Sequence, residues 1–242
     1  MALQSSGAIS LANIQTEFGG SNPISLSEYY GVASGVPSSG AISLSNFYGT
    51  SAAAAAGLYE ANSLSPAQST SWRAAAIDVS SLNVQSEFRL VFRYQNGTQG
   101  TSYRGDFQIQ NVLLADSAIN TIYYENFESN TGSYVTSTGT AESGTYSSVS
   151  SWTSVANGTS TFRWNRDSGG TPSTSTGLST SYGSESFYLY AETSGTSSSG
   201  KYYWLRSPNI TWNYTNKLGS INFIYGALGS NIGTLTTYIE VI

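Results

Sequence analysis

One short phrase occurs three times within the first fifty residues of the chain. Its copies span residues 8–14, 23–29 and 41–47 and read AISLANI, PISLSEY and AISLSNF. In each copy the third residue is a serine, whose side-chain oxygen can cap the free backbone N–H groups at the start of a helix. The isoleucine before that serine and the apolar residue five places after the isoleucine have the spacing of a hydrophobic staple. Each copy is therefore predicted to form one or two helical turns.

Capping residues and glycines mark the boundaries of these turns. The capping serines are Ser10, Ser25 and Ser43, and Glu28 completes a capping box with Ser25. Glycines, which commonly end helices, follow the copies at Gly19, Gly20, Gly31 and Gly49. Because isolated turns of this length are marginal in water, we expect them to form only when they pack against each other or against a partner.

The apolar and aromatic side chains of the same stretch are the expected docking residues. They are Ile9, Leu11, Ile14, Phe18, Ile24, Leu26, Tyr29, Tyr30, Ile42, Leu44, Phe47 and Tyr48. Each buried aliphatic or aromatic side chain contributes about 1.5–3 kcal/mol, so several together can offset the cost of ordering the stretch on a larger assembly.

The composition excludes several kinds of chemistry. The 242 residues include no histidine and no cysteine, which removes Ser-His-Asp catalysis, cysteine nucleophiles and the commonest zinc ligands. A net charge of −5 without a basic cluster argues against binding of nucleic acid. No apolar run approaches the roughly 20 residues that cross a membrane, and residues 1–5 lack the features of a secretory signal. We expect no membrane insertion, no cofactor and no metal site.

Paired carboxylates are a catalytic arrangement that the composition still allows, because a glycosidase needs only two of them. The candidates are Glu125, Glu128, Asp167, Glu185 and Glu192. We favour the interpretation that these are surface or loop residues and that the chain is not an enzyme. Glu128 and Asp167 are also a weaker alternative as ligands of Ca²⁺, which binds carboxylates in loops.

From residue 58 onward the apolar pattern changes to period two, which is typical of half-buried β-strands. Phe88, Leu90, Phe92 and Tyr94 alternate in this way and predict a strand that ends at the turn-forming pair 96–97. Further strands are expected at residues 106–114, 162–164, 186–192, 202–206, 220–225 and 234–242. The fold is therefore predicted to be mainly β, a β-sandwich or jelly roll. The tryptophans expected in its core or between its sheets are Trp152, Trp164, Trp204 and Trp212.

These patterns divide the chain into three segments. Residues 1–49 are the docking segment of helical turns, and residues 58–242 are the β domain. Between them, residues 50–57 are rich in alanine and are interpreted as a linker rather than a short helix.

Several motifs of the β domain resemble a MAM domain, a concanavalin-like jelly roll found on cell-surface proteins. Residues 126–128 (NFE), 151–152 (SW) and 205–208 (LRSP) resemble its opening half, whereas residues 72–79 (WRAAAIDV), 88–93 (FRLVFR) and 105–112 (GDFQIQNV) resemble its second half. The resemblance implies a jelly roll whose halves, residues 58–120 and 121–242, are circularly permuted. We favour pairing of the halves within one chain, and pairing between neighbouring chains is the alternative.

The repeated N-terminal phrase has a resemblance of its own. Residues 5–49 resemble a segment shared by structural proteins of tailed bacteriophages, especially marine and cyanobacterial phages. The resemblance implies a virion structural protein that assembles in the host cytoplasm, contacts other virion proteins and forms a homo-oligomer. A tail-associated appendage such as a fibre, collar or baseplate protein is the first choice, and a capsid decoration protein is the second.

The aromatic residues of the β domain suggest one more function, a lectin-like module that attaches to host glycans. Aromatic rings can stack on the faces of pyranose sugars, and tyrosine and tryptophan are also enriched in protein interfaces. The candidates are Tyr182, Tyr188, Tyr190, Tyr202, Tyr203 and Trp204. We favour core or inter-chain packing for them and keep glycan binding as the alternative.

Overall fold

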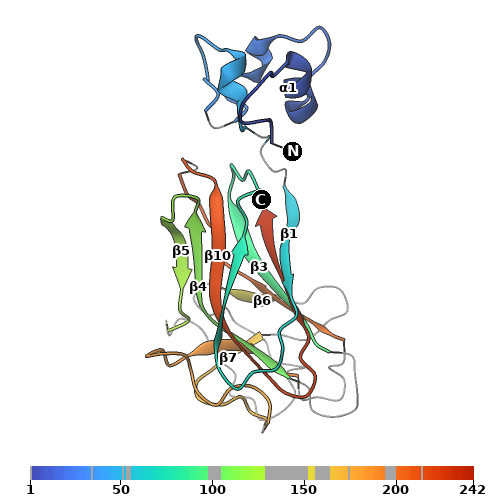
Figure 1. Ribbon diagram of the computed structural model, residues 1–242. Helices are drawn as coiled ribbons and strands as arrows, with labels where there is room; N and C mark the ends of the chain where they lie inside the picture. The colour runs from blue at the N-terminus through green and yellow to red at the C-terminus, as the bar shows by residue number, and fades with distance from the viewer. Residues whose placement is uncertain are drawn as a thin grey trace.

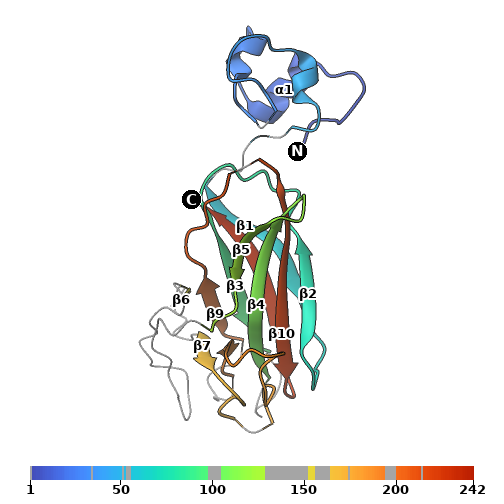
Figure 2. The same cartoon turned by 90° about the vertical axis from the view of Figure 1, so that its left-hand side faces the viewer.

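The structure is a computed structural model that describes residues 2–33, 35–50, 52, 56–97, 105–128, 152–155, 164–173, 175–193, 200–213 and 215–242. Figure 1 shows a small N-terminal unit of helical turns (residues 2–50) above a β-sandwich. The unit lies at the end of the sandwich where the first strand begins and where the chain ends (Figures 1 and 2). The chain is mainly β, as the sequence predicts.

Each copy of the repeated phrase forms the helical turn that the sequence predicts. The α-helix α1 spans Leu11–Phe18, and two 3₁₀ turns, η1 and η2, span Leu26–Tyr29 and Leu44–Phe47. A capping box begins all three elements, although the sequence predicts one only at Ser25. The backbone N–H groups of the three capping serines donate to side chains three residues later, namely Asn13 Oδ1 (3.0 Å), Glu28 Oε1 (3.0 Å) and Asn46 Oδ1 (2.8 Å). An asparagine therefore performs the role of the usual Glu or Gln in two copies.

Two antiparallel sheets pack face to face and form the sandwich. The first sheet contains, in spatial order, β1 (Gly57–Leu64), β11 (Thr234–Val241), β3 (Phe88–Gln95), β9 (Tyr202–Arg206) and β6 (Thr153–Val155). The second sheet contains β2 (Arg73–Asp78), β10 (Leu218–Leu228), β4 (Asp106–Asp116), β8 (Tyr188–Ala191) and β7 (Trp164–Asp167), with β5 (Thr121–Glu125) paired to the far end of β4.

Strands from both expected halves of the β domain alternate within each sheet. In the first sheet, β3 lies between β11 and β9. In the second sheet, β4 lies between β10 and β8. Every one of these pairs joins residues from 58–120 to residues from 121–242 within the same chain, so the core is assembled across the whole length of the sequence.

Aromatic side chains fill the space between the sheets. Phe92 is enclosed, and its ring lies 5.9 Å from Trp152 and 5.4 Å from Phe223, measured between ring centroids. Phe107 stacks on Tyr225 at 5.6 Å with nearly parallel ring planes. Offset and edge-to-face pairs of this kind add stability beyond the area that they bury.

Two of the four tryptophan predictions are corrected in part. Trp152 and Trp164 belong to the core, and Trp212 is only partly buried against it. Trp204 lies on the outer face of the first sheet, in a separate cluster with Val91 and Tyr238. Val91 is thus buried on the face that the alternating pattern assigns to solvent, because the stacked rings of Trp204 and Tyr238 cover it.

The bounds of the strands differ from the predicted ones mainly at their ends. The strands predicted at 88–95 and 202–206 have those bounds, whereas β10 is longer than 220–225 and β8 is shorter than 186–192. The strand predicted at 162–164 begins at Trp164, and residues 162–163 lie outside the described residues. Strand β1 already begins at Gly57, within the expected linker, of which residues 51 and 53–55 lie outside the described part.

Candidate functional site

The candidate carboxylates Glu125 and Glu128 support loops in the structure. Glu125 Oε1 accepts a hydrogen bond from the backbone N–H of Phe127 at 2.6 Å. Glu128 Oε1 accepts from the backbone N–H groups of Ser186 and Phe187 at 2.8 and 2.7 Å. Both carboxylates therefore accept hydrogen bonds from backbone N–H groups that strand pairing does not use, which is a structural role.

Asp167 and Glu185 are held in a similar way. Asp167 Oδ1 accepts from the backbone N–H of Ser168 at 2.7 Å, and partial burial raises the pKa of Asp167 above its ordinary value. Glu185 Oε2 accepts from Asn126 Nδ2 at 3.3 Å. Among the described residues no group of three or more acidic side chains is placed to hold a metal ion.

A buried carboxyl group that the sequence analysis did not select lies at the start of β4. Asp106 is fully buried; its Oδ1 accepts from the backbone N–H of Thr193 at 2.9 Å, and its Oδ2 accepts from Thr176 Oγ1 at 3.0 Å. Burial, together with the nearby charge of Glu192, raises the pKa of Asp106 to about 7. Glu192, the fifth candidate carboxylate, is itself buried and accepts from Ser173 Oγ. The available signal was an acidic residue at the first position of a strand with alternating apolar residues.

The three repeated phrases share one core within the N-terminal unit. Ile14, Tyr29 and Phe47 occupy the last position of the three copies, and all three are buried there. The rings of Phe18, Tyr29 and Phe47 form a triangle whose centroids lie 6.0–6.3 Å apart. The turns therefore pack against each other, and Ile14, Tyr29 and Phe47 cannot contact a partner unless the unit opens.

Three hydrogen bonds link the copies head to tail. The side chain that directly follows each copy donates to the segment that precedes the next copy, and the third bond returns to the segment before the first. The pairs are Gln15 Nε2 to Asn22 Oδ1 (3.4 Å), Tyr30 OH to the Gly40 carbonyl and Tyr48 OH to the Gly7 carbonyl. The three copies thus close into a ring around their common core.

The isoleucine, the leucine and the last residue of the phrase have the same degree of exposure in all three copies. The remaining docking candidates lie around the core and keep part of their surface open, with Tyr48 the most exposed at 36%. Half-buried are Ile9, Leu11, Phe18, Ile24, Leu26, Tyr30, Ile42 and Leu44. The ring therefore presents a repeated set of isoleucine and leucine side chains that a partner could cover.

The N-terminal unit touches the end of the sandwich. Lys217 Nζ donates to the carbonyl oxygen of Gly49 at 3.2 Å. A polar hollow of about 260 Å³ lies between the two parts and is lined by residues of both, among them Thr50, Asn83 and Asn216. The lining offers hydrogen-bonding groups and the single charge of Lys217, without paired titratable groups among the described residues that line it.

The structure does not bring the six candidate glycan-binding residues together on one open face. Tyr188, Tyr190 and Tyr203 have no exposed surface. Tyr202 and Trp204 lie on the outer face of the first sheet, whereas Tyr182 lies in the loop between β7 and β8, next to the second sheet. Around Arg93, the rings of Tyr202, Trp204 and Tyr238 lie 5.3, 5.5 and 5.2 Å from its guanidinium carbon, so they already act as cation–π partners.

Tyr188 and Tyr190 are buried because the loop between β7 and β8 covers the outer face of the second sheet. Gln108 on β4 binds the backbone of this covering loop twice, through its Nε2 to the Leu178 carbonyl at 3.2 Å and through its Oε1 to the Leu178 N–H. Gly226 on β10 permits this approach, since a Cβ there would lie 2.8 Å from Leu178 Cδ1. The covering loop is described at residues 168–173 and 175–187.

Beyond the covering loop, the same face carries an open groove of about 470 Å³. Its floor is formed by small or aliphatic side chains that alternate with core residues along their strands: Ala74 and Ala76 on β2, Leu113 on β4 and Ile224 on β10. Tyr124 on β5 and Tyr182 in the covering loop also line it, with 51% and 43% of their surface exposed.

Two asparagines line the groove and are fixed by internal hydrogen bonds. Asn111 Oδ1 accepts from Tyr124 OH at 2.9 Å, which leaves the Asn111 amide NH₂ as a donor. Asn222 Nδ2 donates to Ser220 Oγ at 2.9 Å, which leaves the Asn222 carbonyl oxygen as an acceptor. None of the described residues that line this groove is charged.

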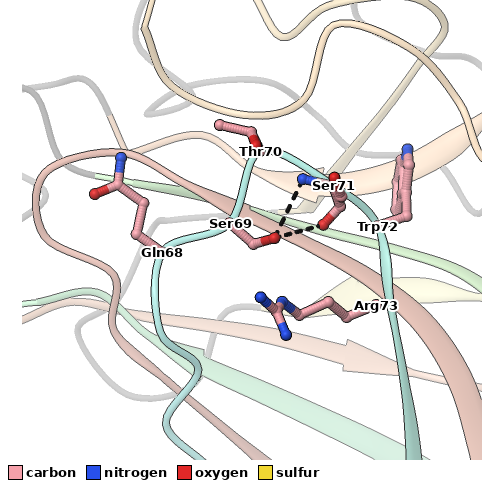
Figure 3. A pocket seen from close by; sticks show the side chains of 6 residues that line it. All are labelled: Gln68, Ser69, Thr70, Ser71, Trp72 and Arg73. Carbon is pink, nitrogen blue, oxygen red and sulfur yellow. Dashed lines mark hydrogen bonds between the residues drawn. The ribbon is translucent and has the colours of Figure 1, made fainter.

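Another hollow, of about 570 Å³ and more polar than this groove, lies beside the segment that leads into β2. Figure 3 shows Ser69 at its turn, where the Ser69 hydroxyl donates to the Ser71 carbonyl and accepts from the Ser71 N–H. Arg73 is the charged residue of its lining. Trp72 is held by a bond from its Nε1 to the Thr180 carbonyl at 2.7 Å, so this segment anchors the covering loop.

No family model matches the sequence, and no solved structure gives a significant match. Within the described residues, no helix has the length and apolar character needed to span a membrane.

Proposed function

We propose that the chain is a structural protein of a tailed-bacteriophage particle, attached through its N-terminal unit and displaying its β-sandwich. The observation that carries this proposal is the ring of three repeated turns. The ring has its own core, yet it leaves equivalent isoleucine and leucine side chains half-exposed around it. A folded element of this kind can dock without the full cost of ordering a disordered leader.

The proposed docking surface differs from the one expected from sequence alone. Ile14, Tyr29 and Phe47 serve the internal core, so docking relies on the side chains that surround them. The half-exposed leucines at equivalent positions of the copies are Leu11, Leu26 and Leu44. Since the unit meets the sandwich at its end, covering its remaining surfaces leaves the sandwich free to project.

The order of the strands supports a jelly roll of the MAM-like kind. Leaving out β5, β6 and β7, successive strands lie in opposite sheets except for β4 and β8, which are neighbours in the second sheet, and the sheet orders are β1-β11-β3-β9 and β2-β10-β4-β8. Such alternation of antiparallel strands is typical of jelly rolls, which occur in virus capsid proteins and in lectins. We place the protein in a tail-associated appendage, with a capsid decoration protein as the alternative, as one chain of a homo-oligomer.

The hydrogen bonds of the candidate carboxylates support a structural role over an enzymatic one. Glu125 and Asp167 accept hydrogen bonds from backbone N–H groups of their own loops, whereas Glu128 and Glu185 link the segment after β5 to the covering loop. Asp106, the carboxyl group with the most altered pKa, is enclosed and hydrogen-bonded on both oxygens.

The test is incorporation of the full chain into particles. The chain is tagged after Ile242, which is exposed, and is supplied during particle assembly. Purified particles are then compared by quantitative mass spectrometry with particles assembled in the presence of Leu11→Ser, Leu26→Ser or Leu44→Ser variants. We expect the unaltered chain to be recovered with the particles and each leucine variant to be recovered several-fold less.

Ser39→Asn, an exposed polar position of the same unit, is the matched control and should be incorporated normally. Hydrogen exchange of residues 9–48 verifies that each leucine variant keeps the folded ring. Failure of the unaltered chain to copurify with particles would refute the proposed function. Normal incorporation of all three folded leucine variants would refute the docking surface.

A further inference from the structure

The geometry points to a binding site for a neutral pyranose sugar in the groove between Tyr124 and Tyr182 on the outer face of the second sheet. This inference concerns the displayed sandwich and does not depend on how the N-terminal unit docks. Among the residues involved, only Tyr182 is a glycan-binding candidate on sequence grounds. The others, above all Tyr124, Asn111 and Asn222, are brought together by strand pairing.

The walls and floor of the groove suit the apolar face of a sugar ring. Two tyrosine rings with about half of their surface exposed are unusual on a sandwich whose other large aromatic side chains are mostly buried. The alanines Ala74 and Ala76 line the same groove, and their small side chains leave room above the sheet. A volume of about 470 Å³ lies within the usual range of small-molecule sites.

The polar groups of the groove suit sugar hydroxyls. Asn111 offers an oriented donor and Asn222 an oriented acceptor, as their internal hydrogen bonds require. A hydroxyl group both donates and accepts, so neighbouring hydroxyls of a pyranose can satisfy both amides. A hydrocarbon ligand would cover the Asn111 NH₂ group and the Asn222 carbonyl oxygen without offering either a hydrogen bond, which is costly.

A β-bulge aims Asn111 into the groove. The pairing of β4 with β10 shifts register between Asn222 and Ile224, opposite Asn111, and Asn111 has a φ of +52°. Bulges are common beside binding sites, where they redirect a side chain. Asparagine is among the non-glycine residues that adopt a positive φ most readily, so it suits this position of the bulge.

The charges around the groove favour a neutral sugar over an acidic one. None of the described lining residues is charged, but Glu185 and Glu125 lie close enough to raise the pKa of Tyr124, after the larger effect of its partial burial. A carboxylate or sulfate on the ligand would meet this negative rim. A protein partner fits less well, because the groove has ten lining residues, whereas stable protein interfaces use roughly 20–30 on each side.

The second wall of the groove is preorganised by the covering loop. The backbone N–H of Tyr182 donates to Gln110 Oε1 at 3.0 Å, and the neighbouring Thr180 carbonyl accepts from Trp72 Nε1. Gln108 fixes the loop at Leu178. Because the backbone of the covering loop is held at these three points, Tyr182 loses little further freedom when a ligand stacks on it, which favours binding.

The experiment is ligand-observed NMR on the full chain with a panel of neutral hexasaccharides built from glucose, mannose or galactose. Hexamers of galacturonate and of guluronate serve as acidic probes. We expect saturable binding of at least one neutral probe, reduced about tenfold or more by Tyr124→Ala and by Tyr182→Ala. Tyr124→Phe keeps the ring but removes the bond to Asn111, and we expect a smaller loss.

Tyr202→Ala is the matched control, because Tyr202 is a similarly exposed tyrosine on the other sheet. It should bind as the unaltered chain does, and tryptophan fluorescence should show that all variants are folded. The inference is overturned if no neutral probe binds, if only acidic probes bind, or if both groove variants bind normally. It is also overturned if light scattering shows dimers that Tyr124→Ala dissociates, since a second copy would then be the occupant.

Discussion

The N-terminal unit and the β-sandwich reach a packed core by opposite routes. In the unit, the capping contacts join residues three apart in the sequence. Each of the three copies contributes its last residue to the shared core. In the sandwich, the first strand pairs with the last, so Gly57 lies opposite Val241. The unit is therefore built from local interactions, whereas the sandwich requires contacts between distant parts of the chain.

This difference implies that the two parts differ in stability and that a mutation in one part destabilises that part alone. The buried apolar core of the unit consists of Ile14, Tyr29, Ala33, Val36 and Phe47, with partly buried side chains around it. A core of this size supports only a few kcal/mol. The core of the sandwich is far larger and encloses several aromatic side chains. All five tryptophans lie in the sandwich, so their fluorescence reports on that part alone.

The largest effect is expected from Phe92→Ala in the sandwich. The change removes an enclosed ring that contacts Trp152 and Phe223, and such a truncation typically costs about 3–5 kcal/mol. Guanidinium unfolding followed by tryptophan fluorescence should show this loss. Hydrogen exchange of residues 9–48 should remain unchanged. If protection of those residues falls to the same extent, the two parts form one cooperative unit and the comparison fails.

Phe47→Ala tests the same idea from the other side. The Phe47 ring contacts Phe18 and Tyr29. Removing it is expected to cost about as much free energy as the whole N-terminal unit gains on folding. We expect residues 9–48 to lose their protection from hydrogen exchange, while the tryptophan unfolding curve keeps its midpoint. Leu58→Ala, an exposed position just beyond the unit, should leave both measurements unchanged.

What the sequence could predict follows the same division. The turns at Ser10, Ser25 and Ser43 were predictable because capping depends on residues within one turn. Strand 88–95 was predictable because period-two alternation is also local. That Ile14, Tyr29 and Phe47 face each other rather than a partner depends on how the turns pack, which no spacing within one copy specifies.

The groove was not predictable for a corresponding reason. Its residues come from β2, β4, β5 and β10, whose neighbours are set by long-range pairing. The burial of Tyr188 and Tyr190 depends on a loop that folds over their strand. A signal was present in Gln108 and Gln110, two amides at alternate positions of an apolar strand, because polar side chains on a covered face need partners from another segment.

Asp106 makes the stability of the sandwich depend on pH. Its pKa is raised from an ordinary value of 3.8 to about 7, mainly by burial, so the folded state favours the protonated carboxyl. This contribution to stability is complete below pH 4 and is lost as the pH rises through 7. Asp106→Asn should remove this dependence, so the variant should be more stable than the unaltered chain at pH 8 by about 1–3 kcal/mol.

Tryptophan-detected unfolding at pH 5 and pH 8 checks this prediction. The difference between the variant and the unaltered chain should be larger at pH 8 than at pH 5. Asp78→Asn, at an exposed carboxylate on β2, provides the matched comparison and should not stabilise the chain at pH 8. An equal effect of Asp106→Asn at both pH values would show that Asp106 is ionised in the folded state across this range.

The smallest effect is expected from Ser10→Ala, which removes one cap from the N-terminal unit. Ser10 Oγ accepts from the Asn13 backbone N–H at 3.2 Å, and loss of such a cap typically costs about 1 kcal/mol. Because the three copies share one core, we expect the loss to appear as faster hydrogen exchange in all three turns, not in α1 alone. Ser6→Ala, at an exposed serine just before the first copy, should have no effect. Faster exchange confined to residues 11–18 would mean that the turns unfold separately and that the ring is not a cooperative unit.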